Sequence, residues 1–267
     1  MNNRTAHIKD KRLQLQEKIL LSIVGKDAAI TIFDIGACEG ENSIRYAKLF
    51  PNANIFTFEP FPTNFEMVQQ NISNFEVKNV HPISICLSNS IGETSFYVSS
   101  GKPGDAENQD WDYGNKSSSL LAPEKTLDVH PWLKFEKEIK VKTTTLKQFC
   151  EEQSIAGIDF IHMDVQGAEL MVLQAAQDFI HSINMIWLEV EAEELYKGQP
   201  LEKDIQEFMQ QHHYIKIEDT VYTSAGDQFW VRQSYIFEKK GKWFVWKKQI
   251  YTTLKKNYKK LRRTFLS

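Results

Sequence analysis

The stretch Phe33-Asp34-Ile35-Gly36-Ala37-Cys38-Glu39-Gly40 decides the fold of this 267-residue chain. An apolar run at residues 30–33 precedes it, and a helical pattern at residues 43–49 follows it. A strand, a tight glycine turn and a helix in this order let the backbone approach a nucleotide-like ligand closely. A second strand-like run, residues 55–58, ends at Glu59. A carboxylate at that place usually binds both hydroxyls of a ribose, so the sequence predicts a cofactor cleft.

Composition indicates a protein with a sizeable core, since 42% of the residues are hydrophobic and 12% aromatic. The formal net charge of -3 argues against a general nucleic-acid binder. Cys38, Cys86 and Cys150 are odd in number and widely spaced, so they suggest neither a metal site nor a disulfide framework. Residues 1–16 contain no signal-peptide hydrophobic region, and no apolar stretch is long enough to span a bilayer. We therefore expect a cytoplasmic protein.

Strand and helix patterns alternate along most of the chain, which predicts an α/β fold with a doubly wound, mainly parallel sheet covered on both faces. Three segments are expected: an N-terminal helical segment at 1–29, with an amphipathic helix over 8–24, a main domain at 30–240, and a basic tail at 241–267. Before the last two strands we expect strands at 30–34, 54–58, 80–87, 94–98, 139–144, 158–165 and 185–190, and helices at 41–50, 62–73, 146–153, 166–180 and 201–212. The last two strands, 214–218 and 229–237, should add an antiparallel edge.

Residues 99–132 are the least regular part of the main domain, rich in Gly, Pro, Asn, Asp and Ser. A loop of this length inside a compact domain is usually either functional or disordered. Trp111, Tyr113 and Trp132 favour a lid or substrate loop. A poorly ordered insertion is the competing interpretation.

Two cofactor classes fit the glycine turn, dinucleotides and S-adenosylmethionine. The dinucleotide fingerprint needs a second glycine where this chain has Cys38, so that the backbone can approach a pyrophosphate. Glu39 adds a negative charge beside it. S-adenosylmethionine carries no phosphate and presents a cationic sulfonium, which suits acids at Asp34 and Glu59 better. A turn that merely packs a helix on a sheet is the alternative without a ligand.

Three stretches resemble the FkbM family of S-adenosylmethionine-dependent methyltransferases. They are residues 33–37 with Gly40, residues 58–60 with Asn64 and Asn71, and residues 158–169 with Leu173, the last similar to the family's "iDfiKiDvEGaE" block. A lesser echo is the run Lys116-Ser117-Ser118-Ser119-Leu120. The chain departs from the pattern with Gln166 where Glu is frequent and His162 where Lys is frequent.

The resemblance covers roughly residues 30–240 and implies a class I methyltransferase with a Rossmann-like sheet. It also implies methylation of an oxygen, a sugar hydroxyl in a glycan or secondary metabolite. The acceptor itself, its reacting atom and the oligomeric state stay open. One rival is an NAD(P)-dependent oxidoreductase on a Rossmann fold. The other is a non-catalytic membrane-associated binding protein.

The expected cofactor site comprises Asp34, Gly36, Ala37, Gly40, Glu59, Pro60, Phe61, Leu87, Ser88 and Asp164. Asp34 is expected to meet the amino group of the cofactor's methionine part, directly or through water. Glu59 can accept hydrogen bonds from both ribose hydroxyls. Phe61 would either line the adenine pocket or pack in the core. The resemblance places Leu87 and Ser88 beside the adenine.

Asp164, His162 and Glu169 are the candidate catalytic residues. Asp164 ends a buried strand, and open α/β sheets bind ligands beyond the carboxyl ends of their strands. It could serve as a general base, accept hydrogen bonds or bind a metal, or cap the next helix. Glu169 could instead stabilise the first turn of that helix, and His162 could be a buried core histidine. No His, Asp or Cys spacing commits the chain to a metal.

Residues 242–266 combine many lysines and arginines with aromatic and aliphatic residues at helical spacing. A basic amphipathic helix suits an anionic membrane surface, so we expect peripheral contact with the inner face of a membrane. A helix docked on the domain with a solvated basic face is the alternative, and nucleic acid is a weaker one. No nucleic-acid partner is expected from the chain as a whole.

Overall fold

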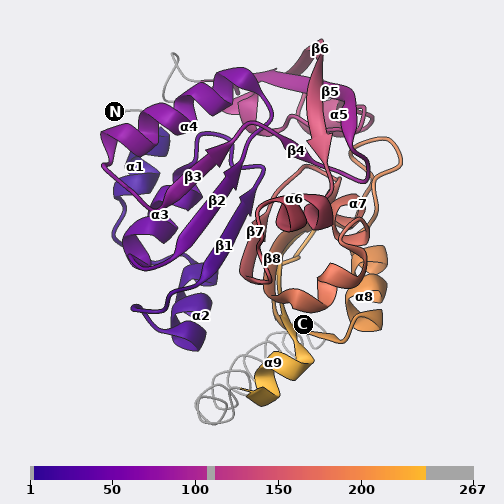
Figure 1. The fold of residues 1–267 in the computed structure, drawn as a ribbon. Coiled ribbons are helices and arrows are strands. Elements are labelled where there is room, and N and C mark those ends of the chain that lie inside the picture. Colours follow the sequence, from indigo (N-terminus) through magenta and orange to yellow (C-terminus); the bar gives the residue numbers. More distant parts are fainter. Residues whose placement is uncertain (1–2, 107–111, 239–267) are drawn as a thin grey trace, which may run out of the picture.

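The computed structural model describes residues 3–106 and 112–238, and a seven-stranded sheet forms the centre of this part of the chain (Figure 1). The strand order is β3-β2-β1-β7-β8-β10-β9. The bounds are β1 Thr31–Ile35, β2 Asn54–Phe58, β3 Val80–Ile83, β7 Ile158–Met163, β8 Ile183–Glu191, β9 Tyr214–Asp219 and β10 Ala225–Arg232. The neighbouring strands β3, β2, β1, β7 and β8 pair in parallel, whereas β10 is antiparallel to both β8 and β9. The predicted α/β sheet, mainly parallel with an antiparallel edge, is confirmed.

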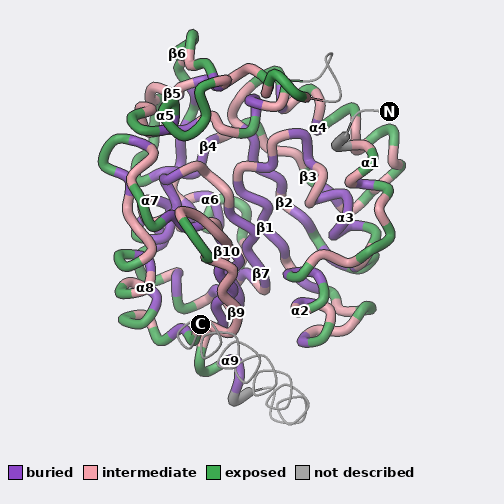
Figure 2. The backbone as a smooth tube through the Cα atoms, turned by 180° about the vertical axis from the view of Figure 1, so that it is seen from behind, coloured by how far each residue is buried: buried purple, intermediate pink, exposed green. Residues whose placement is uncertain are grey.

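Helices cover both faces of this sheet, and Figure 2 shows its strands largely buried between them. One face packs against α6 Leu146–Glu152, α7 Glu169–Gln174 and α8 Glu202–Gln211; the other packs against α2 Leu15–Val24, α3 Glu41–Leu49 and α9 Gln233–Glu238. α4 Pro62–Asn74 lies beside β3 and α3. The two cores explain the apolar strands: in β1, Phe33 and Ile35 enter the first core and Ile32 enters the second.

A smaller sheet of three strands, in the order β4-β6-β5, has its own apolar cluster (Figure 1). Its strands are β4 Cys86–Leu87, β5 Gly92–Gly101 and β6 Leu133–Thr144. Between β5 and β6 the chain forms a 3-10 helix, Tyr113–Lys116, and the short helix α5 Thr126–Val129. The predicted irregular segment 99–132 therefore contains ordered elements, although its residues 107–111 lie outside the described part of the chain.

The prediction of one helix over 8–24 is wrong, because the chain forms α1 Asn3–Lys9 and then starts α2 at Leu15. Arg45 of α3 explains the break. Its guanidinium donates hydrogen bonds to the carbonyl oxygens of His7, Asp10 and Arg12 at 2.8, 2.9 and 2.8 Å. The chain therefore bends around the guanidinium of Arg45 between α1 and α2 and does not continue as one helix.

Two other predicted bounds need correction. The last strand is not 229–237: β10 begins at Ala225, and the chain turns into helix α9 at Gln233, where Tyr235 and Ile236 pack into the second core. The expected helix 166–180 is split into α7 and a 3-10 helix at Gln177–Ser182, and Gln177 has a left-handed φ of 50°. A left-handed residue interrupts a right-handed helix.

The predicted basic tail, residues 241–267, lies outside the described part of the chain, and so does its predicted contact with a membrane through 242–266. Among the residues that the structure describes, no helix combines the length and the apolar character needed to cross a bilayer.

Candidate functional site

The turn after β1 brings the ends of three strands together. Gly36 has a φ of +83°, and a Cβ atom at this position would lie 1.9 Å from the carbonyl oxygen of Asp164. The N–H groups of Gly36 and Ala37 donate to the carbonyl oxygen of Phe58 at 3.1 and 3.0 Å. Only glycine tolerates both this conformation and this contact. The turn therefore closes β1 against β2 on one side and β7 on the other.

Every backbone N–H of residues 36–40 is used within the protein. Beyond the two that bind Phe58, Cys38 donates to Glu59 Oε2 at 2.8 Å. Glu39 donates to Glu41 Oε2 at 3.1 Å, and Gly40 donates to the carbonyl oxygen of Ala37 at 2.7 Å. The turn thus has no spare N–H group for a phosphate, which dinucleotide-binding turns provide.

Glu59 follows β2 directly, and its side chain is buried. Oε2 accepts the Cys38 N–H and Oε1 accepts the Phe61 N–H, both at 2.8 Å. Burial raises the pKa of this carboxyl group to about 8, although the two N–H donors act in the opposite direction. When Glu59 is ionised, each carboxylate oxygen can accept more than one hydrogen bond, so both retain capacity for a ligand hydroxyl.

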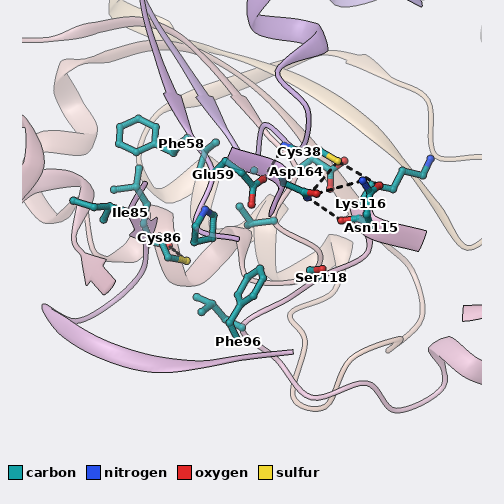
Figure 3. Close-up of a pocket in the computed structure, with 17 residues that line it drawn as sticks. Cys38, Phe58, Glu59, Ile85, Cys86, Phe96, Asn115, Lys116, Ser118 and Asp164 are labelled. Atoms are coloured by element: carbon teal, nitrogen blue, oxygen red, sulfur yellow. Dashed lines mark hydrogen bonds between the residues drawn. The ribbon is translucent and has the colours of Figure 1, made fainter. Parts of the chain in front are cut away.

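A narrow pocket of about 510 Å³, counting its open mouth, lies beyond the ends of β1, β2 and β7 (Figure 3). Its lining residues are Ile35, Gly36, Cys38, Phe58, Glu59, Pro60, Asn64, Ile85, Cys86, Leu87, Phe96, Asn115, Lys116, Ser118, Leu120, Asp164 and Val165. In Figure 3, Phe58, Ile85 and Cys86 lie at one end, and Asn115 and Lys116 lie at the other. Glu59 stands between the apolar end and the polar end.

The chain around the 3-10 helix Tyr113–Lys116 closes the polar end of the narrow pocket. Asn115 is buried; its Nδ2 donates to Glu39 Oε1 at 3.2 Å and to Asn64 Oδ1 at 3.3 Å. Asn64 Nδ2 in turn donates to the carbonyl oxygen of Asn115 at 3.1 Å. Ser119 is fully buried, and its hydroxyl donates to the carbonyl oxygen of Gln166 at 2.7 Å. This part of the predicted lid is therefore anchored to the domain.

Gln166 connects two carboxyl groups at the ends of β7 and β8. Its Nε2 donates to Asp164 Oδ1 at 2.7 Å and to Glu189 Oε2 at 2.8 Å, and its Oε1 accepts the Tyr196 hydroxyl at 3.1 Å. The charge of Asp164 and burial raise the pKa of Glu189 well above its usual value. A glutamate at position 166 would place a third carboxyl group here, whereas the amide supplies a donor to both neighbours.

Glu169 is buried and holds the backbone that follows Asp164. Its Oε1 accepts the N–H of Val165 at 2.9 Å and that of Gly167 at 3.3 Å. Burial raises the pKa of Glu169 to about 7. The side chain of Glu169 lines neither the narrow pocket nor the open cleft described below. Its hydrogen bonds instead hold the backbone of the loop that follows Asp164.

Asp34 lies on the face of the sheet that α3 covers. Its Oδ2 accepts the Ser43 hydroxyl at 2.5 Å, and the Ser43 and Thr57 hydroxyls are 2.6 Å apart. Burial raises the pKa of Asp34 to about 7. The side chain lines neither cavity, so the expected contact of Asp34 with a ligand amino group stays a prediction.

His162 pairs with Asp34 across β7 and β1, beneath α3. Its Nδ1 lies 2.6 Å from the Tyr46 hydroxyl, and its Nε2 lies 3.4 Å from Asn42 Nδ2. Burial lowers the pKa of His162 to about 4, so the ring is neutral near pH 7. A histidine with this pKa is a weak proton acceptor.

An open cleft of about 1120 Å³, counting its mouth, adjoins the narrow pocket and shares Gly36, Cys38, Lys116 and Asp164 with it. Its other lining residues are His7, Gln14, Gln16, Ala37, Glu41, Asn42, His162, Trp187 and Asp227. Asp164 therefore stands where the two cavities meet. Within residues 3–106 and 112–238, no group of three or more His, Cys, Asp or Glu side chains is arranged to hold a metal ion.

The structure brings most of the predicted site residues together. Gly36, Glu59, Pro60, Leu87 and Asp164 line the narrow pocket, and Ala37 and His162 line the open cleft. Asp34, Gly40, Ser88 and Glu169 lie behind these walls, and Phe61 packs against the cluster of the small sheet. The sequence did not assign several other lining residues to the site, namely Cys38, Asn64, Asn115 and the N-terminal residues His7, Gln14 and Gln16. The run at 116–120 was a usable signal for the lid, whereas nothing local pointed to residues 7–16.

Comparison with known proteins places these features in a family. The model of the FkbM methyltransferase domain matches residues 34–216. The 2-O-methyltransferase NoeI of Sinorhizobium fredii is 32% identical over 168 residues, 63% of this chain and 66% of that protein. The hexuronic acid methyltransferase AglP of Haloferax volcanii is 25% identical over 177 residues, 66% of this chain and 62% of that protein.

The chain thus spans just under two thirds of the length of each of these relatives. Among solved structures, a precorrin-6y C5,15-methyltransferase of Geobacter metallireducens is 15% identical and loosely similar, with a TM-score of 0.41 over 83% of this chain and 90% of that chain. The domain match covers more than half of the 267 residues and includes the glycine turn, Glu59 and Asp164. The chain belongs to the FkbM methyltransferase family.

Proposed function

We propose that this protein transfers a methyl group from S-adenosylmethionine to an oxygen atom, a sugar hydroxyl of a glycan or secondary metabolite. The observation that carries the proposal is a narrow pocket, apolar at one end and with Glu59 at its middle, that joins an open cleft at Asp164. Such a pair of cavities suits one ligand that donates a group and a second that receives it. The names of the two relatives, a 2-O-methyltransferase and a hexuronic acid methyltransferase, support the acceptor class.

The lining of the narrow pocket fits the parts of S-adenosylmethionine. Glu59 would accept hydrogen bonds from both ribose hydroxyls, and Leu87 with its apolar neighbours would enclose the adenine. The glycine turn uses its N–H groups internally, which suits a ligand that carries no phosphate. Pro60, Phe61 and Ser88 would support these walls.

The same turn disfavours the dinucleotide alternative. A pyrophosphate needs free backbone N–H donors in the glycine turn that precedes the helix, and here all five N–H groups of residues 36–40 have partners inside the protein. Cys38 itself occupies a left-handed conformation, with a φ of 53°, that a dinucleotide turn would assign to glycine.

In the proposed reaction the cofactor supplies an activated methyl group, and the protein positions the acceptor. Holding the acceptor oxygen in line with the methyl group provides much of the acceleration. Asp164 would take the proton of the acceptor hydroxyl, a contribution of about 10²- to 10⁴-fold. Gln166 would orient the Asp164 carboxylate, and Glu169 would hold its loop. His162 would offer a hydrogen bond from the wall of the cleft, because a neutral ring of low pKa is poorly suited to proton transfer.

Calorimetric titration of the full chain with S-adenosylmethionine, S-adenosylhomocysteine and NAD tests the proposal. Binding of the first two and not of NAD is expected, followed by transfer of a radiolabelled methyl group to members of a glycan panel. Absence of binding to both sulfur ligands would overturn the proposal. For the predicted membrane contact, liposome co-sedimentation should fall when residues 241–267 are deleted, and unaltered binding would contradict it.

A further inference from the structure

The open cleft has one wall that lies outside the family domain. The domain match covers residues 34–216. Four residues that line the cleft lie outside this range in the sequence: His7, Gln14 and Gln16 before it, and Asp227 after it. The cleft also contains the residues that it shares with the narrow pocket, among them Asp164. A molecule bound in the cleft would therefore lie beside side chains that the family domain does not supply.

The N-terminal segment of this wall is firmly attached to the rest of the protein. Arg45 and Glu17 form an ion pair at 2.7 Å, with only 5% and 2% of their side chains exposed. The Arg45 Nε donates to Glu17 Oε1 and Nη2 donates to Glu17 Oε2, both at 2.7 Å. These two bonds, together with the three to the carbonyl oxygens of His7, Asp10 and Arg12, use all five N–H donors of the guanidinium. A buried pair stabilises a structure only when its hydrogen bonds are completed in this way.

The side chains on this wall match a hydroxyl-rich ligand. Gln14 and Gln16 carry both donors and acceptors, and Gln16 also bonds the Tyr46 side chain. The buried Trp187 side chain hydrogen-bonds to Asp227, whose carboxylate oxygens can accept further bonds. A few convergent polar groups are typical of sites that orient a small molecule. The arrangement suits the alternating donors and acceptors of a sugar ring.

The charge of the cleft disfavours sugars that carry a carboxylate. Glu41, Asp164 and Asp227 line it, and among the described lining residues Lys116 is the one lysine or arginine. Burial lowers the pKa of both His7 and His162, so neither ring adds a positive charge near pH 7. A carboxylate on the acceptor would meet acids of like charge across this wall, which disfavours binding.

We propose that residues 7–17, held by Arg45, form with Asp227 the wall of an acceptor subsite, and that this subsite takes a sugar ring without a negative charge. The proposal rests on the methyltransferase function proposed above. It assigns acceptor selection to the segments that flank the family domain, and it separates this chain from the relative that is named a hexuronic acid methyltransferase.

Saturation-transfer NMR on the full chain, saturated with S-adenosylhomocysteine, tests the subsite directly. The probes are neutral methyl hexosides, each paired with the matching methyl hexuronide. We expect the neutral member of a pair to bind at least tenfold more tightly. Hexuronides that bind equally well, or no glycoside binding by a protein that does bind S-adenosylhomocysteine, would overturn the subsite. Failure to bind S-adenosylhomocysteine would instead overturn the proposed function.

Two variants make the test specific. Gln14→Ala should weaken hexoside binding at least fivefold. Asp227→Asn should reduce the ratio of hexoside affinity to hexuronide affinity at least threefold. Both should bind S-adenosylhomocysteine within twofold of the parent protein, which also shows that they fold. Lys18→Ala, exposed on the adjacent helix α2, serves as the matched control and should change neither quantity. If both test variants kept the hexoside affinity and the hexoside-to-hexuronide affinity ratio of the parent protein, the proposal would be contradicted.

Discussion

The carboxylate of Glu59 accepts the backbone N–H of Cys38 at 2.8 Å, and this bond joins the end of β2 to the turn that follows β1. Cys38 holds a left-handed backbone conformation at this point, with a φ of 53°. A non-glycine residue keeps such a conformation only where its surroundings enforce it. One side chain thus both shapes the turn and faces the pocket that the turn borders.

Glu59→Gln should weaken binding of S-adenosylhomocysteine at least tenfold, about 1.4 kcal/mol. An amide has one acceptor oxygen, so its nitrogen would face one of the two backbone N–H groups and could not accept from the second ribose hydroxyl. Calorimetry measures the change, with Glu93→Gln on the exposed part of β5 as the control. The loss should shrink for a 2′-deoxy analogue of the ligand. An equal loss for both ligands would limit Glu59 to shaping the turn.

Asp164→Asn should lower the single-turnover rate of methyl transfer by about 10²- to 10⁴-fold, the usual contribution of a general base. The amide oxygen can still accept from Gln166 Nε2, so the local structure and the affinity for S-adenosylhomocysteine should be nearly unchanged. Asp178→Asn, on the exposed surface beside Lys147, is the control. An unchanged rate would exclude Asp164 as a required base.

Asp34→Asn should make the free energy of unfolding less dependent on pH. Burial raises the pKa of Asp34 from 3.8 to about 7, so between these values the folded state holds a proton that the unfolded state has lost. This carboxyl group therefore lowers stability progressively as the pH rises from about 4 to about 7. Urea denaturation should show the variant gaining at least about 1 kcal/mol on the parent between pH 5 and pH 8. A difference that does not change with pH would contradict this account, and exposed Asp27→Asn serves as the surface control.

Gly36→Ala should cost more than about 3 kcal/mol of stability or prevent folding, because strain and overlap add at this position. The φ of +83° disfavours a side chain, and the new methyl group would lie 1.9 Å from the Asp164 carbonyl oxygen. Gly104→Ala, where a Cβ atom meets nothing within 4 Å, should stay within about 0.5 kcal/mol of the parent. Chemical denaturation compares the two. Equal stabilities would show that β1 and β7 do not approach as described.

Much of the pocket could be predicted because its signals are local. Gly36 and Glu59 each follow a strand directly, and a parallel sheet brings such strand ends to one edge without further information. Asp164 is predicted for the same reason, with a distinctive block of sequence around it. These side chains depend on the order of elements along the chain, which the alternating patterns indicate.

The remaining parts depend on distant partners that no window of sequence contains. The break between α1 and α2 is imposed by Arg45 of α3, although residues 8–24 alone favour one helix. Asn115 enters the site through hydrogen bonds with Glu39 and Asn64, more than 50 residues away along the chain. The end of β10 is set by pairing with β8 up to Val231, whereas the apolar pattern continues beyond it.

The attachment of the N-terminal segment by Arg45 has a consequence for how the acceptor preference of this protein could change. Three of its five hydrogen bonds go to main-chain oxygens, which every amino acid provides, and the other two go to Glu17. Exchange of His7 or Gln14 would leave this attachment intact. New side chains could therefore be sampled beside the cleft at little risk to folding, so that mutation could alter the choice of acceptor while the chemistry stays unchanged.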